Sequence, residues 1–100
     1  MPSVEEMTQA LRASAEAEPG SAKSLKIHMG EEGVIRIAGS QVDNEDQPTD
    51  CTINVTKEDF EQIVAGELDP TQAFMSGKLR VDGDVGVAIE LQSVIGRAFG

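Results

Sequence analysis

The stretch AFMSGKLRVDGDVGVAIELQSV, residues 73–94, holds the pattern that decides the expected fold. A short strand at residues 78–81 leads through a turn into a last helix, whose N-cap is Asp84. Only Glu90, Gln92 and Ser93 interrupt the apolar residues of this helix with polar side chains. A helix that is apolar on most of its sides has to be covered by another part of the chain.

The first half of the chain alternates between apolar and polar residues in the manner of β-strands. Ser3 and Glu6 form a capping box that opens a first helix, and Pro19-Gly20 ends that helix. The segments that follow are predicted to be strands. They cover residues 24–29, residues 34–39, a poor edge strand within the acidic segment 40–50, and residues 51–55.

The second half changes to helical spacing. Thr56 caps a short helix that ends at Gly66, and Asp69-Pro70 begins another that ends at Gly77. The order is therefore a helix, three or four strands, two short helices, a strand and a helix. A chain of 100 residues is expected to form one domain, spanning residues 1–100.

The chain has few large side chains with which to fill a core. Phe60, Phe74 and Phe99 are its only aromatic residues, and it contains no Trp and no Tyr. The core must be built from aliphatic residues and Met, or else it leaves space unfilled.

The charge excludes several classes of function. With 18 acidic and 8 basic residues the net charge is −10, which argues against nucleic acids and against electrostatic docking on anionic lipids. One cysteine cannot form an internal disulfide, and no signal peptide or apolar run of about 20 residues is visible. We expect a soluble, cytoplasmic protein.

Residues suited to catalysis are scarce. His28, the only histidine, falls on the polar side of its strand, whereas Cys51 falls on the apolar side of another, so the two cannot form a nucleophile–base pair. The acidic run 43–46 resembles a calcium loop only loosely, because Pro48 occupies the position that needs a glycine. We predict no enzyme activity, no metal site and no cofactor.

Four basic residues alternate with inward apolar residues. They are Lys26, Arg36, Lys78 and Arg80, which are half of the positive charge. They are expected on the outer face of one sheet, where exposed strands ordinarily carry long side chains. The alternative is a patch for an acidic partner or a lipid headgroup.

Residues 50–94 resemble the sterol carrier protein 2 family of lipid-binding domains. The similarity lies in the strand DCTI at 50–53, the capped helix with Asp59-Phe60, the segment ELDPTQAFMSGKL at 67–79 and the ending VDGDVGVAIEL at 81–91. The first half agrees only in layout. The resemblance implies an α/β (α+β) fold, with a mixed, mostly antiparallel sheet of about five strands and helices on one face that enclose an apolar tunnel.

The family resemblance also implies non-enzymatic binding, and intracellular transfer, of a fatty acid, a fatty acyl-CoA or a sterol-like lipid. We favour a fatty-acyl ligand over a sterol, because Ser76 stands where relatives often place Gln and little of the chain remains to close the tunnel. Transient contact with membranes is expected through apolar residues near the tunnel mouth, Met75 and Phe99. The alternative is an accessory or dimerising module of the same fold whose apolar opening is a protein interface.

The inward positions around the last helix predict the lipid-binding residues. The predicted set is Phe60, Val64, Phe74, Met75, Ile89 and Ile95 on the helical side, with Ile35, Ile53 and Val81 on the sheet. The family resemblance adds Ser76, at a position of the tunnel where relatives often have Gln.

Overall fold

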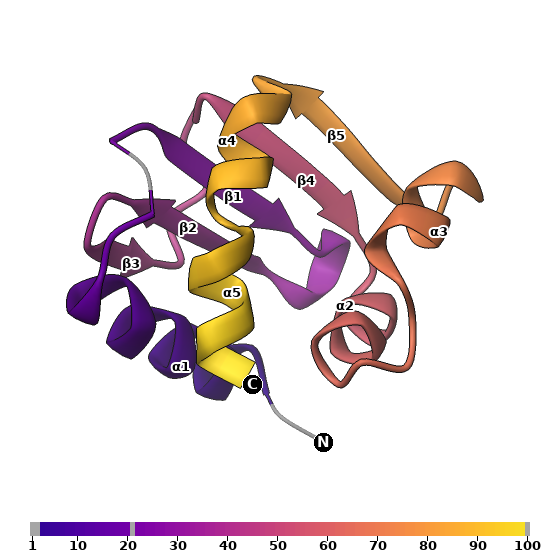
Figure 1. The fold of residues 1–100 in the computed structure, drawn as a ribbon, viewed down its shortest axis with the longest axis horizontal. Helices are drawn as coiled ribbons and strands as arrows, with labels where there is room; N and C mark the ends of the chain where they lie inside the picture. Colours follow the sequence, from indigo (N-terminus) through magenta and orange to yellow (C-terminus); the bar gives the residue numbers. More distant parts are fainter. Residues whose placement is uncertain (1–2, 21, 100) are drawn as a thin grey trace.

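Five strands form a single sheet in the computed structural model, which describes residues 3–20 and 22–99. The strand order across the sheet is β3-β2-β1-β4-β5. The strands are β1 (Ser24–His28), β2 (Val34–Ala38), β3 (Gln41–Asp43), β4 (Cys51–Val55) and β5 (Leu79–Gly83). Figure 1 shows the sheet behind the C-terminal helices, with β3 and β5 at its two edges.

The sheet is mixed but mostly antiparallel, as the family resemblance implied. The pairs β1–β2, β2–β3 and β4–β5 are antiparallel, and the central pair β1–β4 is parallel. The connection from β3 to β4 therefore has to cross the sheet. It passes over the outer face, where Asp46 Oδ1 lies 2.8 Å from Lys26 Nζ.

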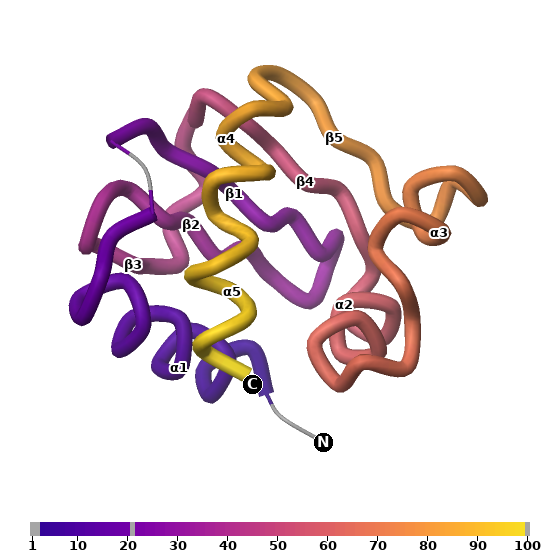
Figure 2. The backbone as a smooth tube through the Cα atoms, viewed as in Figure 1, coloured from indigo at the N-terminus to yellow at the C-terminus, as the bar shows by residue number. Residues whose placement is uncertain are grey.

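Three helices cover the inner face of the sheet: α1 (Val4–Ala17), α4 (Val85–Glu90) and α5 (Gln92–Phe99). The capping box predicted at Ser3 and Glu6 is present at the start of α1. Although α1 and α5 stand at opposite ends of the chain, they run side by side (Figure 2). The buried hydroxyl of Ser14 joins them by donating to the carbonyl oxygen of Val94 at 2.7 Å.

Two short helices follow β4, namely α2 (Lys57–Val64) and α3 (Pro70–Met75). Thr56 Oγ1 accepts from the N–H of Asp59, and Asp69 Oδ1 accepts from the N–H of Thr71, so both predicted N-caps are confirmed. Gly66 and Gly77 follow the two helices with φ of 80° and 83°, a conformation that suits glycine. A 3₁₀ turn, η1 (Gly30–Glu32), connects β1 to β2.

The C-terminal segment differs from its prediction in two details. The last helix is broken at Leu91 into α4 and α5 rather than continuous. Strand β5 begins at Leu79 and not at Lys78, because the N–H of Lys78 donates to the carbonyl of Ala73 at 2.9 Å and so belongs to the end of α3.

The basic residues of the outer face are largely neutralised within the chain. Arg36 forms a two-bond ion pair with Asp43, at 2.6 and 3.0 Å, and also contacts Glu45. Lys26 pairs with Asp46. Asp43 at the end of β3 and the acidic residues that follow it thus neutralise two of the four predicted basic residues. No helix in the described part of the chain is long and apolar enough to span a bilayer.

Candidate functional site

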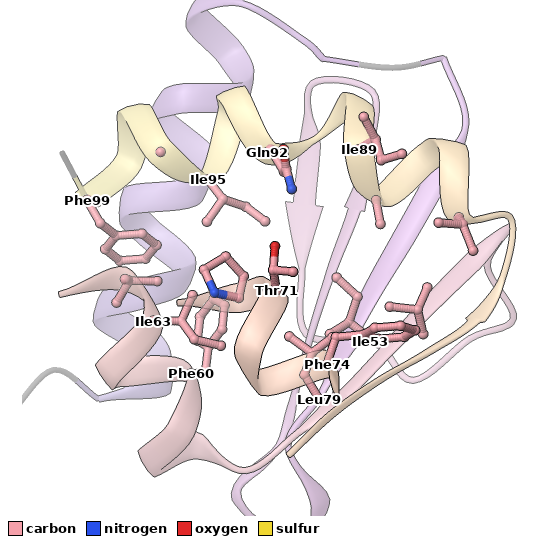
Figure 3. Close-up of a pocket in the computed structure, with 16 residues that line it drawn as sticks. Ile53, Phe60, Ile63, Thr71, Phe74, Leu79, Ile89, Gln92, Ile95 and Phe99 are labelled. Atoms are coloured by element: carbon pink, nitrogen blue, oxygen red, sulfur yellow. The ribbon is translucent and has the colours of Figure 1, made fainter. Parts of the chain in front are cut away.

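An apolar cavity of about 560 Å³ lies between the β4–β5 half of the sheet and the helices α2 to α5. Figure 3 shows its side chains converging from these elements. The residues that line it are Ile53, Phe60, Ile63, Val64, Pro70, Thr71, Phe74, Leu79, Val81, Val85, Ala88, Ile89, Gln92, Ile95, Gly96 and Phe99.

The cavity explains why the C-terminal helices are apolar on most of their sides. One face, with Val87, Leu91 and Val94, is buried in the core against the sheet and α1. A second face lines the cavity, and its members recur at three- and four-residue spacing, as one helical face requires. They are Val85, Ala88, Ile89, Gln92, Ile95, Gly96 and Phe99.

The cavity opens to solvent between α3 and α4. Three of its large apolar lining side chains remain more than half exposed: Phe74 at 57%, Val85 at 54% and Ile89 at 62%. We call these three residues the rim. At the α2–α5 end, by contrast, the rings of Phe60 and Phe99 meet edge to face, and Phe60 is buried. The cavity is therefore closed at one end and open at the side.

Thr71 and Gln92 are the two polar side chains in the lining. In Figure 3 the hydroxyl oxygen of Thr71 and the amide nitrogen of Gln92 point into the same space from α3 and α5. Within residues 3–20 and 22–99, neither side chain has a hydrogen-bond partner. Both groups are available to a polar atom of a bound molecule.

Comparison with known proteins agrees with this geometry. The model of the SCP-2 sterol transfer family matches residues 5–96. The chain belongs to the SCP-2 sterol transfer family. Human "Sterol carrier protein 2" is 39% identical over 56 residues, which are 56% of this chain and 10% of the human protein. The chain thus spans only a small part of the curated relatives that it matches.

Solved structures share the fold. The chain superposes on Sterol Carrier Protein 2 Like 2 from Aedes aegypti with a TM-score of 0.74 and 20% identity, covering 88% of this chain and 92% of that one. The solution structure of the palmitated form of that protein gives a TM-score of 0.72 at 24% identity, covering 94% and 95%.

Most of the predicted lipid-binding residues line the cavity. They are Ile53, Phe60, Val64, Phe74, Val81, Ile89 and Ile95.

Ile35, Met75 and Ser76 do not line it. Ile35 is inward and fully buried, but its strand β2 lies two places from β4 under α1, so it packs in the core. Met75 is 80% exposed because α3 turns Phe74 toward the cavity and its neighbour away. Ser76 ends α3, where its hydroxyl donates to the carbonyl of Ala73 at 3.3 Å.

The remaining lining residues were not in the predicted lipid-binding set, although Phe99 was expected near the tunnel mouth. They are Ile63, Pro70, Thr71, Leu79, Val85, Ala88, Gln92, Gly96 and Phe99. Helical spacing from Ile89 and Ile95 could have found Gln92 and Gly96 in the sequence. Thr71 gave no such signal, because its place depends on how α3 packs on β5.

The residues considered for catalysis lie apart from each other. Cys51 is buried on the inner face, where burial raises the pKa of its thiol, and His28 alternates with the inward Ile27 and so faces the other way. Among the described residues no group of three His, Cys, Asp or Glu side chains could hold a metal ion.

Proposed function

We propose that this chain binds a lipid with one acyl chain, without catalysing a reaction, in the cavity between the sheet and α2–α5. The observation that carries the proposal is the cavity itself, whose lining is apolar except for Thr71 and Gln92. Its volume of about 560 Å³ falls within the range of roughly 300–1,000 Å³ that is usual for small-molecule sites.

Burial of the acyl chain supplies the affinity. Each methylene group removed from water contributes about 0.8 kcal/mol, so a C14–C18 chain gains on the order of 11–14 kcal/mol before the entropic cost of association. That cost is several kcal/mol, which leaves binding in the micromolar range. The two polar side chains can receive the carboxyl or ester group of such a ligand.

Two further observations favour an acyl chain over a sterol. The similar mosquito protein was solved in a palmitated form. The cavity is also open along the rim, and a flexible chain adapts to an open cavity, whereas a rigid ring system needs a matching shape. A fatty acid or a fatty acyl-CoA fits the proposal, because a large headgroup can remain outside the rim.

A carrier also has to collect its ligand. We propose brief contact with uncharged bilayers through the rim and the adjacent Met75, because these are the large apolar side chains exposed on the described chain. Phe99, which was predicted to take part, packs on Phe60 at the closed end instead. A cytoplasmic location remains a prediction from the sequence.

Thermal unfolding tests the proposal directly. A ligand that binds only the folded protein stabilises it by about 2.7 kcal/mol at a hundredfold excess over Kd, which raises the Tm of a domain of this size by roughly 10 °C. Palmitate, palmitoyl-CoA and cholesterol form the panel, and octane-1-sulfonate tests for nonspecific detergent effects. Stabilisation by the acyl ligands supports the proposal.

The second candidate function, a protein-interaction module of the same fold, predicts the opposite result. If none of the panel moves the Tm, and native mass spectrometry finds no lipid on protein purified from cells, the rim is a protein interface and the carrier proposal is wrong.

A further inference from the structure

Strand β5 leaves one edge of the sheet unpaired. The N–H of Asp84 donates to the carbonyl of Asp50 at 2.9 Å, and this pair continues the β4–β5 register of Cys51 with Gly83. Because hydrogen-bonded and non-bonded pairs alternate in an antiparallel ladder, Asp82 and Arg80 also bond toward β4.

The backbone groups of Leu79, Val81 and Gly83 consequently point away from β4. Strand β5 is the last in the sheet order, and within the described residues no further strand lies beyond it. A row of unpaired N–H and C=O groups of this kind is a template for another strand.

The charges along β5 and at its two ends indicate which strand can pair with this free edge. Lys78, Arg80, Asp82 and Asp84 occupy alternate positions, two positive and then two negative, around Val81. If a second copy pairs antiparallel about a two-fold axis at Val81, Arg80 lies opposite Asp82 of the second copy. A register centred on either neighbour of Val81 would instead place Arg80 or Asp82 opposite itself, so only one register is favourable.

Charged residues on an edge strand often serve to prevent pairing. Charges of one sign along the whole edge would repel a second copy. Here the two positive residues precede the two negative ones, so in an antiparallel pair each positive residue lies opposite a negative residue of the second copy. Arg80 is exposed, and neither it nor Lys78 forms an ion pair within residues 3–20 and 22–99. Asp82 uses one oxygen to accept from Asn54 at 2.8 Å and keeps the other free for Arg80 of the second copy.

The same register places Lys78 opposite Asp84 of the second copy, and this outer pair is weaker than the inner pair of Arg80 and Asp82. Asp84 already accepts from Lys23 at 2.9 Å and caps α4 through Gly86. Lys78 therefore adds attraction at longer range, and the contact between Arg80 and Asp82 sets the register.

The exposed apolar side chains flank the same strand. Antiparallel pairing brings the residues before β5 in one copy to the same end as the residues after β5 in the other. Met75, 80% exposed at the end of α3, then lies at the same end as Val85 of the second copy, 54% exposed at the start of α4. A two-fold contact is self-complementary, so this apolar contact occurs twice.

We propose that the free edge of β5 pairs antiparallel with β5 of a second copy of this chain about a two-fold axis at Val81, forming one continuous ten-stranded sheet. This proposal does not rest on the proposed lipid binding, because it is argued from the backbone edge and its charges. The interface nevertheless includes Met75 and Val85, which also belong to the proposed membrane contact.

Charge reversal tests the pairing. Size-exclusion chromatography with light scattering, up to millimolar concentration, should find the wild-type chain approaching twice its 10.6 kDa mass. Arg80→Glu and Asp82→Lys each set like charges against one another in a homodimer, and each should weaken self-association by about tenfold or more. An equimolar mixture of the two variants restores opposite charges at both pairs and should dimerise again. The double variant R80E/D82K, whose net charge equals that of wild type, should also dimerise.

Amide hydrogen exchange identifies the surface. The N–H groups of Leu79, Val81 and Gly83 should become protected as protein concentration rises, and should lose that protection in R80E. A wild-type chain that stays monomeric overturns the proposal. So does a dimer that both single variants leave intact, or one in which these three amides exchange at the same rate at every concentration.

Discussion

The rings of Phe60 and Phe99 meet edge to face at a centroid distance of 6.2 Å and an interplanar angle of 90°. Phe60 belongs to α2 and Phe99 to the last turn of α5, so one aromatic contact joins the middle of the chain to its C-terminal helix. Both rings line the cavity, and their contact closes its α2–α5 end.

This aromatic contact should contribute measurably to stability. Edge-to-face pairs are worth about 0.5–1.5 kcal/mol beyond the area they bury. A double-mutant cycle of Phe60→Leu and Phe99→Leu, measured by urea unfolding, should therefore give a coupling energy in that range. The matched control is Phe74→Leu, because Phe74 lines the same cavity but is 57% exposed. A coupling energy between Phe60 and Phe99 no larger than that between Phe60 and Phe74 would contradict the prediction.

Gly96 offers a way to fill the cavity without disturbing the core. It lies within α5 and lines the cavity, and a Cβ added to it would meet nothing within 4 Å. Gly96→Ala should raise the free energy of unfolding by up to about 1 kcal/mol, because glycine is a poor helix former. Gly96→Phe should place a ring in the cavity and weaken binding of a fluorescent fatty acid by about tenfold or more, since the methylene groups it displaces lose their burial.

The pair of Gly96 variants separates stability from binding. Gly96→Ala should retain fatty-acid binding while Gly96→Phe loses it, and both should remain folded by circular dichroism. Undiminished uptake by Gly96→Phe would show that the fatty acid binds elsewhere.

Local features of the fold could be predicted from the sequence, because each depends on residues close together in the chain. The caps at Ser3, Thr56, Asp69 and Asp84 are all present. The order of the strands could not be predicted in this way, since it depends on the crossover from β3 to β4. Alternation placed Ile35 correctly on the inner face, but only the sheet order shows that its strand lies under α1 and away from the cavity.

The site was harder to predict than the fold for the same reason. Phe74 and Met75 are adjacent apolar residues of a six-residue helix, too short for a spacing pattern to show which one faces inward. The ion pairs of Lys26 and Arg36 could not be predicted either, because they depend on tertiary structure: Asp43 lies opposite Arg36 on strand β3, and Asp46 lies in the segment that crosses the outer face. Sequence periodicity thus predicts which face of a helix or strand a residue occupies, whereas its contacts depend on how distant segments pack together.

Gln92 should discriminate between polar groups of the ligand. Its amide can donate a hydrogen bond to a carboxylate, and such charge-assisted bonds contribute about 1.5–3 kcal/mol. Gln92→Leu should therefore reduce the preference for palmitate over its methyl ester by roughly tenfold, as measured by competition with a fluorescent fatty acid. Its stability should stay within about 0.5 kcal/mol of wild type, because Gln92 is exposed. Thr71→Val is the matched variant on the opposite wall, and an unchanged preference in both variants would place the carboxylate outside the cavity.

The ion pair between Arg36 and Asp43 should make stability depend on pH. The hydrogen bond from Arg36 holds the pKa of Asp43 below its ordinary value, and the N–H of Glu45 lowers it further. Because the pKa is lower in the folded state than in the unfolded chain, the unfolded chain binds the proton more readily. The stabilisation is therefore complete above the ordinary aspartate pKa of about 4, and is lost as pH falls through the lowered value.

Variants of this pair measure that contribution. Asp43→Asn should be less stable than wild type at pH 7, and the difference in free energy of unfolding should shrink as the pH is lowered below about 4. Arg36→Gln removes the same ion pair by removing its basic partner. The stability of this variant should therefore also depend less on pH than that of wild type. Urea unfolding between pH 7 and pH 3 provides the measurement. A difference between Asp43→Asn and wild type that stays constant over this range would show that the ion pair does not hold the carboxylate in its charged form.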